Sequence, residues 1–234
     1  MARNYNKVIL IGTIETDLEL RQTAKNGTNV TNFSLITVEK RDSKDGEKIY
    51  KKWHHIVCWG KLADNIVNTF KKGDVVYVEG SISYRSYVNK ENNKLNVTEI
   101  KASSINKWDG TGNLNKIILV GNIATDLDLR QTTNGVNVTN FSLNTIDRWK
   151  DKEGLLKTHK KWHRLVAWGK TAEIAVNNIK QGMLVLVEGT LSYRTYVNKD
   201  NVKNNHVAEI KITNIMKWAN PIKIDNEVID DQID

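Results

Sequence analysis

The 234-residue chain contains one sequence pattern twice. "NKVILIG" from Asn6 returns as "NKIILVG" from Asn115, and "NVTNFSL" from Asn29 returns unchanged from Asn137. The offset of about 109 residues is too long for one unit of a solenoid and matches the size of a small domain. We therefore predict two copies of one fold, with domain 1 over residues 1–108, a linker over 109–114, domain 2 over 115–218 and an acidic tail over 219–234.

Each copy has the pattern of β-structure interrupted by one helix. In the first copy, apolar runs and alternation predict strands near residues 7–12, 30–38, 53–60, 74–88 and 96–105. Leu62, Ile66 and Phe70 have helical spacing and Gly73 follows as a stop signal, so a helix separates the third and fourth strands. This order predicts an all-β fold with one helix per domain, the OB-fold, which is a five-stranded Greek-key barrel. A β-sandwich is the alternative, although the helix in that place argues against it.

Two tryptophans recur in a short basic segment, as "KKWHHIVCWGK" and as "KKWHRLVAWGK". Alternate side chains of a strand share a face, so Trp53, His55, Val57 and Trp59 lie on one side. The other side carries His54, Ile56 and Cys58, of which the last two suit a barrel interior, whereas His55 suits an outer face better. The tryptophan face is therefore predicted to be exposed. The second copy repeats it with an arginine in place of the histidine, at Trp162, Arg164 and Trp168.

Further aromatic residues lie beside positive charges. Arg85 and Tyr87 share one strand face, the pair returns as Arg194 and Tyr196, and Trp149 lies between two cations in a predicted loop after the second strand. A base stacked on an aromatic side chain contributes about 1–3 kcal/mol whatever its identity, and Lys or Arg neutralises the phosphates. The net charge of +8 agrees with a polyanionic partner. Because the bases of a duplex are already stacked, this pattern favours an unpaired strand.

These segments, together with "NKVILIGTIETDLELR" and "KKGDVVYVEGSISYRSY", resemble the bacterial single-stranded DNA-binding protein family over residues 6–108 and 115–218. The resemblance implies sequence-independent binding and protection of single-stranded DNA in replication, recombination and repair. It implies that bases stack on an aromatic set: Trp53, Trp59, Tyr87, Trp149, Trp162, Trp168 and Tyr196. It implies that phosphates are contacted by a basic set: Lys7, Arg21, Arg41, Lys61, Arg85, Lys116, Arg130, Lys170 and Arg194. Arg41 is the first-copy counterpart of Trp149, so the two domains are not expected to bind identically.

The resemblance also implies contacts with other protein chains. His54 and His163 match a histidine found at subunit contacts in the family, and a buried structural histidine is the alternative. Two OB-folds in one chain, as in the Deinococcus and Thermus members, imply a homodimer that presents four OB-folds. The acidic tail ends at Asp234 without the terminal Pro-Phe that recruits replication and repair proteins in the family, so such partners are left open.

Other function classes find less support. "GKT" at Gly169 lacks the glycine that a phosphate-binding loop needs five residues earlier, and His159 and His163 lack the glutamate of a zinc protease. We expect no enzymatic activity, no metal and no cofactor. An RNA-binding or primosome-type OB-fold module is the alternative, since the sequence contains no sign of 2′-hydroxyl recognition. A protein-binding pair of OB-folds is a third possibility.

The sequence also bears on the cellular compartment. The single cysteine, Cys58, excludes an intrachain disulfide and fits a reducing cytoplasm. The N-terminal segment has no apolar run suited to a signal peptide, and no run reaches the roughly 20 residues of a membrane helix. We expect a cytoplasmic, nucleoid-associated protein without a membrane partner.

Overall fold

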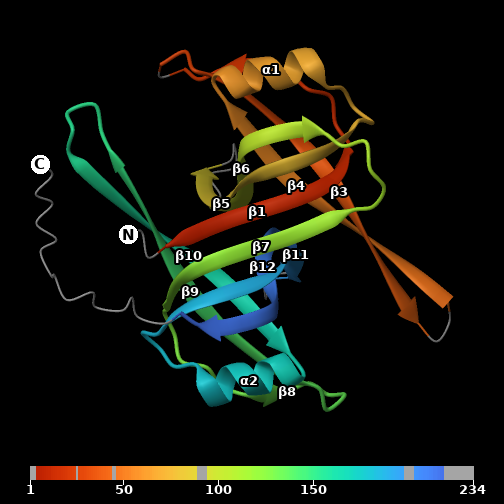
Figure 1. Cartoon of the computed structure of the whole chain (residues 1–234), viewed down its shortest axis with the longest axis vertical. Helices are drawn as coiled ribbons and strands as arrows, with labels where there is room; N and C mark the ends of the chain where they lie inside the picture. Colours follow the sequence, from red (N-terminus) through yellow and green to blue (C-terminus); the bar gives the residue numbers. More distant parts are fainter. Residues whose placement is uncertain (1–3, 25, 44–45, 89–93, 198–202, 219–234) are drawn as a thin grey trace, which may run out of the picture.

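The computed structural model describes residues 4–24, 26–43, 46–88, 94–197 and 203–218, which fold into two similar halves (Figure 1). The tail predicted over 219–234 lies outside these residues. Domain 1 contains β1 (Tyr5–Ile14), β2 (Arg21–Gln22), β3 (Asn29–Ser43), β4 (Gly46–Trp59), α1 (Lys61–Thr69), β5 (Val75–Val88) and β6 (Lys94–Lys107). Domain 2 contains β7 (Leu114–Ile123), β8 (Arg130–Gln131), β9 (Asn137–Lys150), β10 (Leu156–Trp168), α2 (Lys170–Asn178), β11 (Leu184–Val197) and β12 (Lys203–Lys217).

Five strands of each half form a closed barrel. In domain 1 the strand order is β3-β4-β6-β5-β1, and a short pairing of Thr13 with Ile36 and of Ile14 with Leu35 closes the ring between β1 and β3. β4 and β6 run parallel, whereas the other neighbours are antiparallel. A register shift at Gly80 lets the long strand β5 pair with β6 and with β1. Domain 2 repeats this arrangement, which confirms two tandem OB-folds.

Each helix lies between the third and fourth barrel strands, as predicted, and covers one end of its barrel (Figure 1). Gly60, with φ of 56°, connects the end of β4 to α1, and Gly169, with φ of 53°, does the same for α2. These left-handed conformations favour glycine. Ala63 and Ile66 of α1 are completely buried and belong to the core cluster. Each helix therefore begins directly after the second tryptophan of its domain and fixes where that strand ends.

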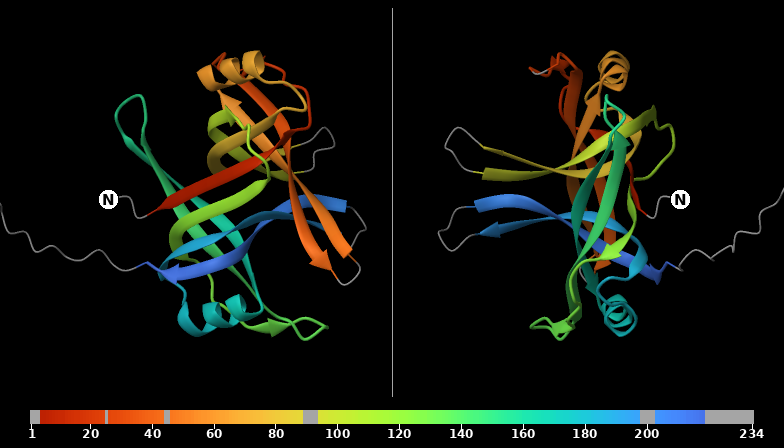
Figure 2. Two further views of the ribbon diagram at one scale, coloured as in Figure 1. Left: turned by 45° about the vertical axis from the view of Figure 1, so that its right-hand side comes forward. Right: turned by 90° about the vertical axis from the view of Figure 1, so that its left-hand side faces the viewer.

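The second and third barrel strands are longer than the sequence predicted. β3 was expected over residues 30–38, but it continues to Ser43 and pairs with β4 from its first residue, Gly46. In domain 2 the loop predicted at Trp149 is wrong, because Trp149 lies in β9 opposite Lys157 of β10, and His159 also lies in a paired strand, opposite Asp147. The two hairpins project beyond the barrels in opposite directions (Figure 2).

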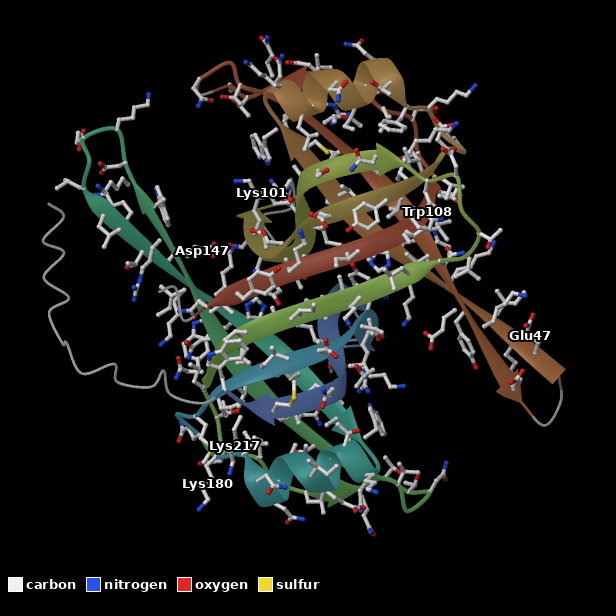
Figure 3. All side chains as sticks on the ribbon, viewed as in Figure 1. Glu47, Lys101, Trp108, Asp147, Lys180 and Lys217 are labelled. Atoms are coloured by element: carbon white, nitrogen blue, oxygen red, sulfur yellow. The ribbon has the colours of Figure 1, made fainter. Side chains whose placement is uncertain are left out.

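Cross-strand ion pairs explain why these hairpins form from charged sequence. Lys52 Nζ lies 2.8 Å from Glu39 Oε2, and Lys161 Nζ lies 2.7 Å from Asp147 Oδ2. In each pair the two residues are diagonal neighbours across the strands, and an opposite-charge pair between antiparallel strands contributes roughly 0.2–1 kcal/mol. Figure 3 places Glu47 near the end of the β3–β4 hairpin, far from the barrel of domain 1.

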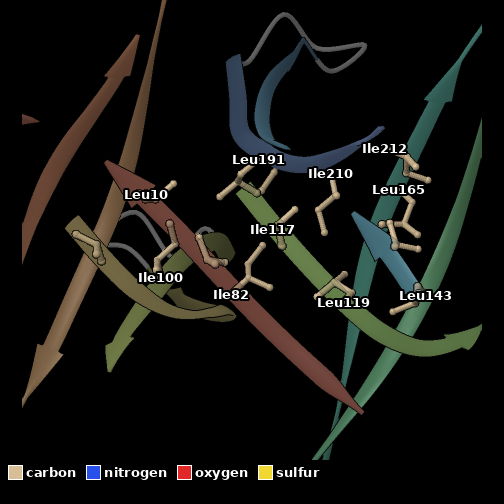
Figure 4. Packing of buried hydrophobic residues seen from close by; sticks show 14 of the residues in the cluster. Leu10, Ile82, Ile100, Ile117, Leu119, Leu143, Leu165, Leu191, Ile210 and Ile212 are labelled. Carbon is tan, nitrogen blue, oxygen red and sulfur yellow. The ribbon is translucent and has the colours of Figure 1, made fainter. Parts of the chain in front are cut away.

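The two barrels are joined edge to edge by their first strands. β1 and β7 pair in antiparallel register from Tyr5 opposite Val120 to Ile11 opposite Leu114, so the described strands form one twelve-stranded sheet. β7 begins at Leu114, the last residue of the predicted linker. The buried apolar residues of both barrels belong to one cluster, which includes Leu10 of β1 and Ile117 of β7 (Figure 4). The two domains are thus packed as one body.

Candidate nucleic-acid interface

The third strand of each barrel presents its tryptophans outward. On β4, Trp53 is 53% exposed and Trp59 is 42% exposed. The alternate residues His54, Ile56 and Cys58 are completely buried, as the alternation predicts, whereas Val57 on the tryptophan face is buried as well, at 5% exposed. On β10, Trp162 is 54% exposed and Trp168 is partly exposed. An exposed indole surrounded by solvent is available for stacking by a planar ligand.

Cations lie over the tryptophans of domain 2. Lys160 Nζ lies 4.9 Å from the centroid of the Trp162 ring, and Arg194 Cζ lies 5.8 Å from that of Trp168. Both distances fall within the range of a cation–π contact. Positive charge is therefore held beside the rings on which a base would stack, where the phosphates of the same strand would pass.

Arginines from the neighbouring strands reach the same face. Arg85 Nη2 lies 2.8 Å from Glu99 Oε1, and Arg194 Nε lies 2.8 Å from Glu209 Oε2. β6 runs parallel to β4 with Val57 opposite Lys101, which puts the exposed Lys101 beside the tryptophan strand. Sequence reasoning missed Lys101, because its strand is more than forty residues away along the chain and only the parallel register brings it here.

Four more residues of the predicted basic set lie at the end of the tryptophan face that carries Trp59 or Trp168. Arg21 is opposite Val30, which is in turn opposite Trp59, so the three residues form one rung across β2, β3 and β4. Domain 2 repeats this rung with Arg130, Val138 and Trp168. Arg21 Nη2 is 2.7 Å from Glu19 Oε2 in an exposed ion pair. Exposed lysines follow at the first residue of each helix, Lys61 and Lys170.

Some predicted site residues lie elsewhere. Lys7 forms an ion pair with Glu79, and Lys116 Nζ lies 3.1 Å from Glu188 Oε1. These ion pairs lie on β1 and β5, or on β7 and β11, none of which is a neighbour of the tryptophan strand β4 or β10 in the sheet. Trp149 is 49% exposed but lies on the part of β9 that projects in the β9–β10 hairpin. It is five residues beyond Asn144, which lies opposite Trp162, or about 17 Å away at 3.4 Å per residue.

Three predicted residues are described only in their backbone. Arg41 belongs to β3, opposite Lys48, and Tyr87 belongs to β5, opposite Leu95. Tyr196 belongs to β11, opposite Asn204. Their side chains lie outside the described part of the structure.

The histidine predicted at a subunit contact lies between the two OB-folds of the same chain. His54 is completely buried, with Nε2 2.8 Å from Thr37 Oγ1 and Nδ1 3.2 Å from the hydroxyl of Tyr193 in domain 2. Burial, and secondarily the charge of Lys52, lowers the pKa of His54 to about 3. The imidazole is therefore neutral, and both of its ring nitrogens have a hydroxyl partner.

The contact is repeated with the domains exchanged. His163 has Nε2 2.8 Å from Thr145 Oγ1 and Nδ1 3.0 Å from the hydroxyl of Tyr84 in domain 1. Burial and the charge of Lys161 lower the pKa of His163 to about 3, against an opposing effect of Asp147. These two histidines position the domains and face away from the exposed tryptophan surface.

A shallow cleft adjoins the tryptophan face of domain 1. Its volume is about 330 Å³, and it is lined by Thr16, Asp17, Glu19, Arg21, Asn32, Phe33, Ser34 and His55. His55 lies opposite Ser34 in the β3–β4 pairing, and it is half-buried. Burial lowers the pKa of His55, Glu99 opposes this effect and Arg85 adds to it. The cleft offers hydroxyl, amide and basic groups beside an aromatic face.

Other chemistry finds no site in the described part of the chain. No three His, Cys, Asp or Glu side chains among the described residues are grouped so as to hold a metal ion. Burial raises the pKa of Cys58 to about 12, so its thiol stays protonated and unreactive. Within the same residues no helix is long and apolar enough to cross a membrane.

Comparison with protein families gives matches over both barrels. The model of the "Single-strand binding protein family" matches residues 5–107 and 114–217. A relative from Deinococcus radiodurans named single-stranded DNA-binding protein is 28% identical over 222 residues, which cover 88% of this chain and 73% of the relative. Its namesake from Thermus aquaticus is 29% identical, with 82% and 76% covered. A Chlorobaculum tepidum protein named single-stranded DNA-binding protein 1 is 37% identical over 102 residues, which span 63% of its length and thus less than two thirds.

Solved structures agree with these matches. The crystal structure of wild-type single-stranded DNA binding protein from Thermus aquaticus superimposes with a TM-score of 0.73 at 25% identity, covering 94% of this chain and 95% of that one. A deletion mutant of that protein gives a TM-score of 0.75 with 96% and 100% covered. Both barrels and their relative placement therefore have a solved counterpart.

Proposed function

Because the chain belongs to the single-strand binding protein family, we propose that it binds single-stranded DNA without regard to sequence and protects it during replication, recombination and repair. Bases stack on Trp53 and Trp59 in domain 1 and on Trp162 and Trp168 in domain 2. We assign base stacking also to Trp149, Tyr87 and Tyr196. Arginines and lysines beside the tryptophans neutralise the phosphates.

The observation that carries this proposal is the exposure of two tryptophans on the outer face of the third strand in both barrels. Large aromatic side chains are normally buried, and burial of the alternate residues shows that this strand has a well-formed inner face. Outward tryptophans flanked by cations suit unpaired bases, whose flat surfaces are free, and do not suit a duplex.

The proposal is tested by intrinsic tryptophan fluorescence during titration with oligo-dT of about 35 nucleotides. This length is about twice the upper site size of one OB-fold. We expect strong quenching by the single strand, none by a duplex of equal length, and weaker binding as salt rises. Each phosphate contact contributes about 0.7 to the slope of log K against log salt. Lys61→Ala and Lys170→Ala are therefore expected to reduce that slope by about 0.7 each. Absence of quenching at low salt contradicts the proposal.

The RNA-binding alternative is tested in the same assay. Equal lengths of oligo-dT and oligo-U compete for the protein at one salt concentration. Preference for the DNA strand supports the proposed function, whereas preference for RNA supports the alternative. The protein-binding alternative predicts that alanine in place of Trp53 or Trp162 leaves the affinity for either strand unchanged.

We also propose that two chains associate into a homodimer that presents four OB-folds and acts on the nucleoid in the cytoplasm. Resemblance to the two-OB-fold members of the family supports this assembly. Light scattering coupled to size-exclusion chromatography is expected to give twice the chain mass of 26.7 kDa. A mass of one chain across the micromolar range contradicts the homodimer and leaves DNA binding as a separate question.

A further inference from the structure

The two tryptophan faces differ at the position between their tryptophans. Domain 1 has His55 there and domain 2 has Arg164, and both residues occupy the same place in the barrel. His55 lies opposite Ser34 of β3, and Arg164 lies opposite Ser142 of β9. An arginine is charged at any pH a protein tolerates, whereas a histidine changes its charge near neutrality.

A strand of DNA stacked on both tryptophans of domain 1 has to pass His55. Along β4, Trp53 and Trp59 are six residues apart, or roughly 20 Å, and His55 is about 7 Å from the first of them at 3.4 Å per residue. Trp53, His55 and Trp59 all point outward, and His55 also lines the cleft of about 330 Å³ described above. The phosphates between two stacked bases therefore come within reach of the imidazole.

The charges around His55 are nearly balanced when DNA is absent. Arg85 and Glu99 form an ion pair beside it, and Arg21 and Glu19 form another across the cleft. The charged groups that face it come from β5, β6 and the segment around β2. They are Arg85, Glu99, Asp17, Glu19 and Arg21, and Lys101 follows two residues after Glu99 on β6. No single neighbour holds the imidazole in its charged form.

A phosphate would change this balance. In the free protein burial lowers the pKa of His55, with Glu99 opposing and Arg85 adding to the effect. An anion within about 4–6 Å favours the protonated imidazolium instead. Proton binding and DNA binding at this position are therefore coupled, and each strengthens the other by the same factor.

Building on the proposed function, we propose that His55 is a DNA-backbone contact that takes up a proton when a strand occupies domain 1, whereas Arg164 makes the corresponding contact in domain 2 without proton uptake. The two halves of the chain then differ in their response to pH. Domain 1 binds more tightly as pH falls through the pKa that His55 has in the complex with DNA, and domain 2 keeps its affinity.

The test compares wild type with His55→Arg and Arg164→His. Affinity for oligo-dT is measured between pH 5.5 and 8.5 at constant salt, and calorimetry in two buffers of different ionisation enthalpy counts the protons taken up. One proton changes the affinity by at most about tenfold per pH unit. We expect uptake in wild type, its loss in His55→Arg, and additional uptake in Arg164→His.

The other histidines supply the controls. His54 and His163 are buried and stay neutral in this range, because burial lowers the pKa of each to about 3. His159 and His206 are replaced by asparagine in separate variants, and these are expected to keep the wild-type pH dependence. If His55→Arg does not fold, as judged by circular dichroism, His55→Asn and Arg164→His decide the question.

The outcomes separate the inference from the function on which it rests. An equal pH dependence in wild type and His55→Arg, with DNA binding intact in both, overturns the role of His55 alone. Loss of the pH dependence in His159→Asn or His206→Asn overturns it as well. Failure of every protein to bind oligo-dT at any pH contradicts the proposed function itself.

Discussion

Gly12 of β1 lies so close to Ile36 of β3 that a Cβ atom at position 12 would be 2.2 Å from the Ile36 carbonyl oxygen. Gly121 of β7 has the same relationship to Asn144 of β9, also at 2.2 Å. The contact closes each barrel where its first strand meets the strand beside the tryptophan strand. A side chain at either position would push the two strands apart.

Gly12→Ala and Gly121→Ala are therefore expected to destabilise the protein. The contact is with backbone, which cannot rotate away, so the loss is in the upper part of the roughly 1–3 kcal/mol typical of overpacking. Urea unfolding followed by circular dichroism measures it. Thr13→Ala, at the next and partly exposed position, is the matched control and is expected to change the free energy of unfolding little. An unchanged urea midpoint in Gly12→Ala contradicts this account of barrel closure.

The hydroxyl groups of Tyr193 and Tyr84 hold the domains together through His54 and His163. Tyr193→Phe removes a hydroxyl that lies 3.2 Å from His54 Nδ1 and leaves a buried ring nitrogen without that partner. A loss of about 1–3 kcal/mol in the free energy of unfolding is expected. Tyr77→Phe removes a hydroxyl bonded to Glu79 within one domain and near solvent, and is the matched control with a smaller effect. Equal effects of both variants contradict an interdomain role.

The buried histidines make stability depend on pH. Their pKa is about 3 in the folded protein against 6.5 as the ordinary value, so the unfolded chain binds more protons between these limits. The stabilisation is complete above pH 6.5 and is lost as pH falls toward 3, by about 1.4 kcal/mol per pH unit for each histidine. Urea unfolding at pH 4.5 to 7.5 measures this slope. His163→Asn is expected to lose stability at all pH values but to have a shallower slope, and an unchanged slope contradicts the assignment.

The exposed tryptophans are expected to dominate affinity for single-stranded DNA. Trp53→Ala and Trp162→Ala each remove one stacking surface, with an expected loss of about 1–3 kcal/mol, or roughly 5- to 150-fold in Kd. Trp218, which is 47% exposed at the end of β12 and outside the tryptophan face, supplies the control Trp218→Ala. Fluorescence anisotropy of a labelled oligo-dT measures all three variants. A larger effect of Trp218→Ala than of Trp53→Ala contradicts the placement of the interface.

Much of the fold follows from the sequence, because the residues that specify it are local. Alternation along 53–60 identifies which face of β4 is buried, and the helix between β4 and β5 follows from apolar spacing and Gly73. The projecting parts of the β3–β4 and β9–β10 hairpins cannot be predicted in this way. Arg41 and Trp149 lie there in runs of charged residues, whose strand structure depends on pairing across the hairpin. Local propensity is weak there, and the partner strand decides the conformation.

The site is predicted only in part for the same reason. Residue type and spacing are enough to identify Trp53, Trp59 and their counterparts in domain 2. Lys7 has the same residue type as Lys61, and only the sheet order separates it from the tryptophan face and puts it beside Glu79. The edge pairing of β1 with β7 cannot be predicted from the sequence, because the segment "NKVILIG" can pair equally well with any exposed strand edge.

That edge pairing has a consequence for how a long strand is held. Since β1 and β7 make the two barrels one body, the second aromatic track stands at a fixed distance and orientation from the first. A strand captured by one barrel then meets the other as an intramolecular partner, at an effective concentration set by the geometry of the sheet and not by the amount of protein in solution. Each barrel can bind weakly on its own and release its own segment of the strand, while the whole chain stays bound to the DNA.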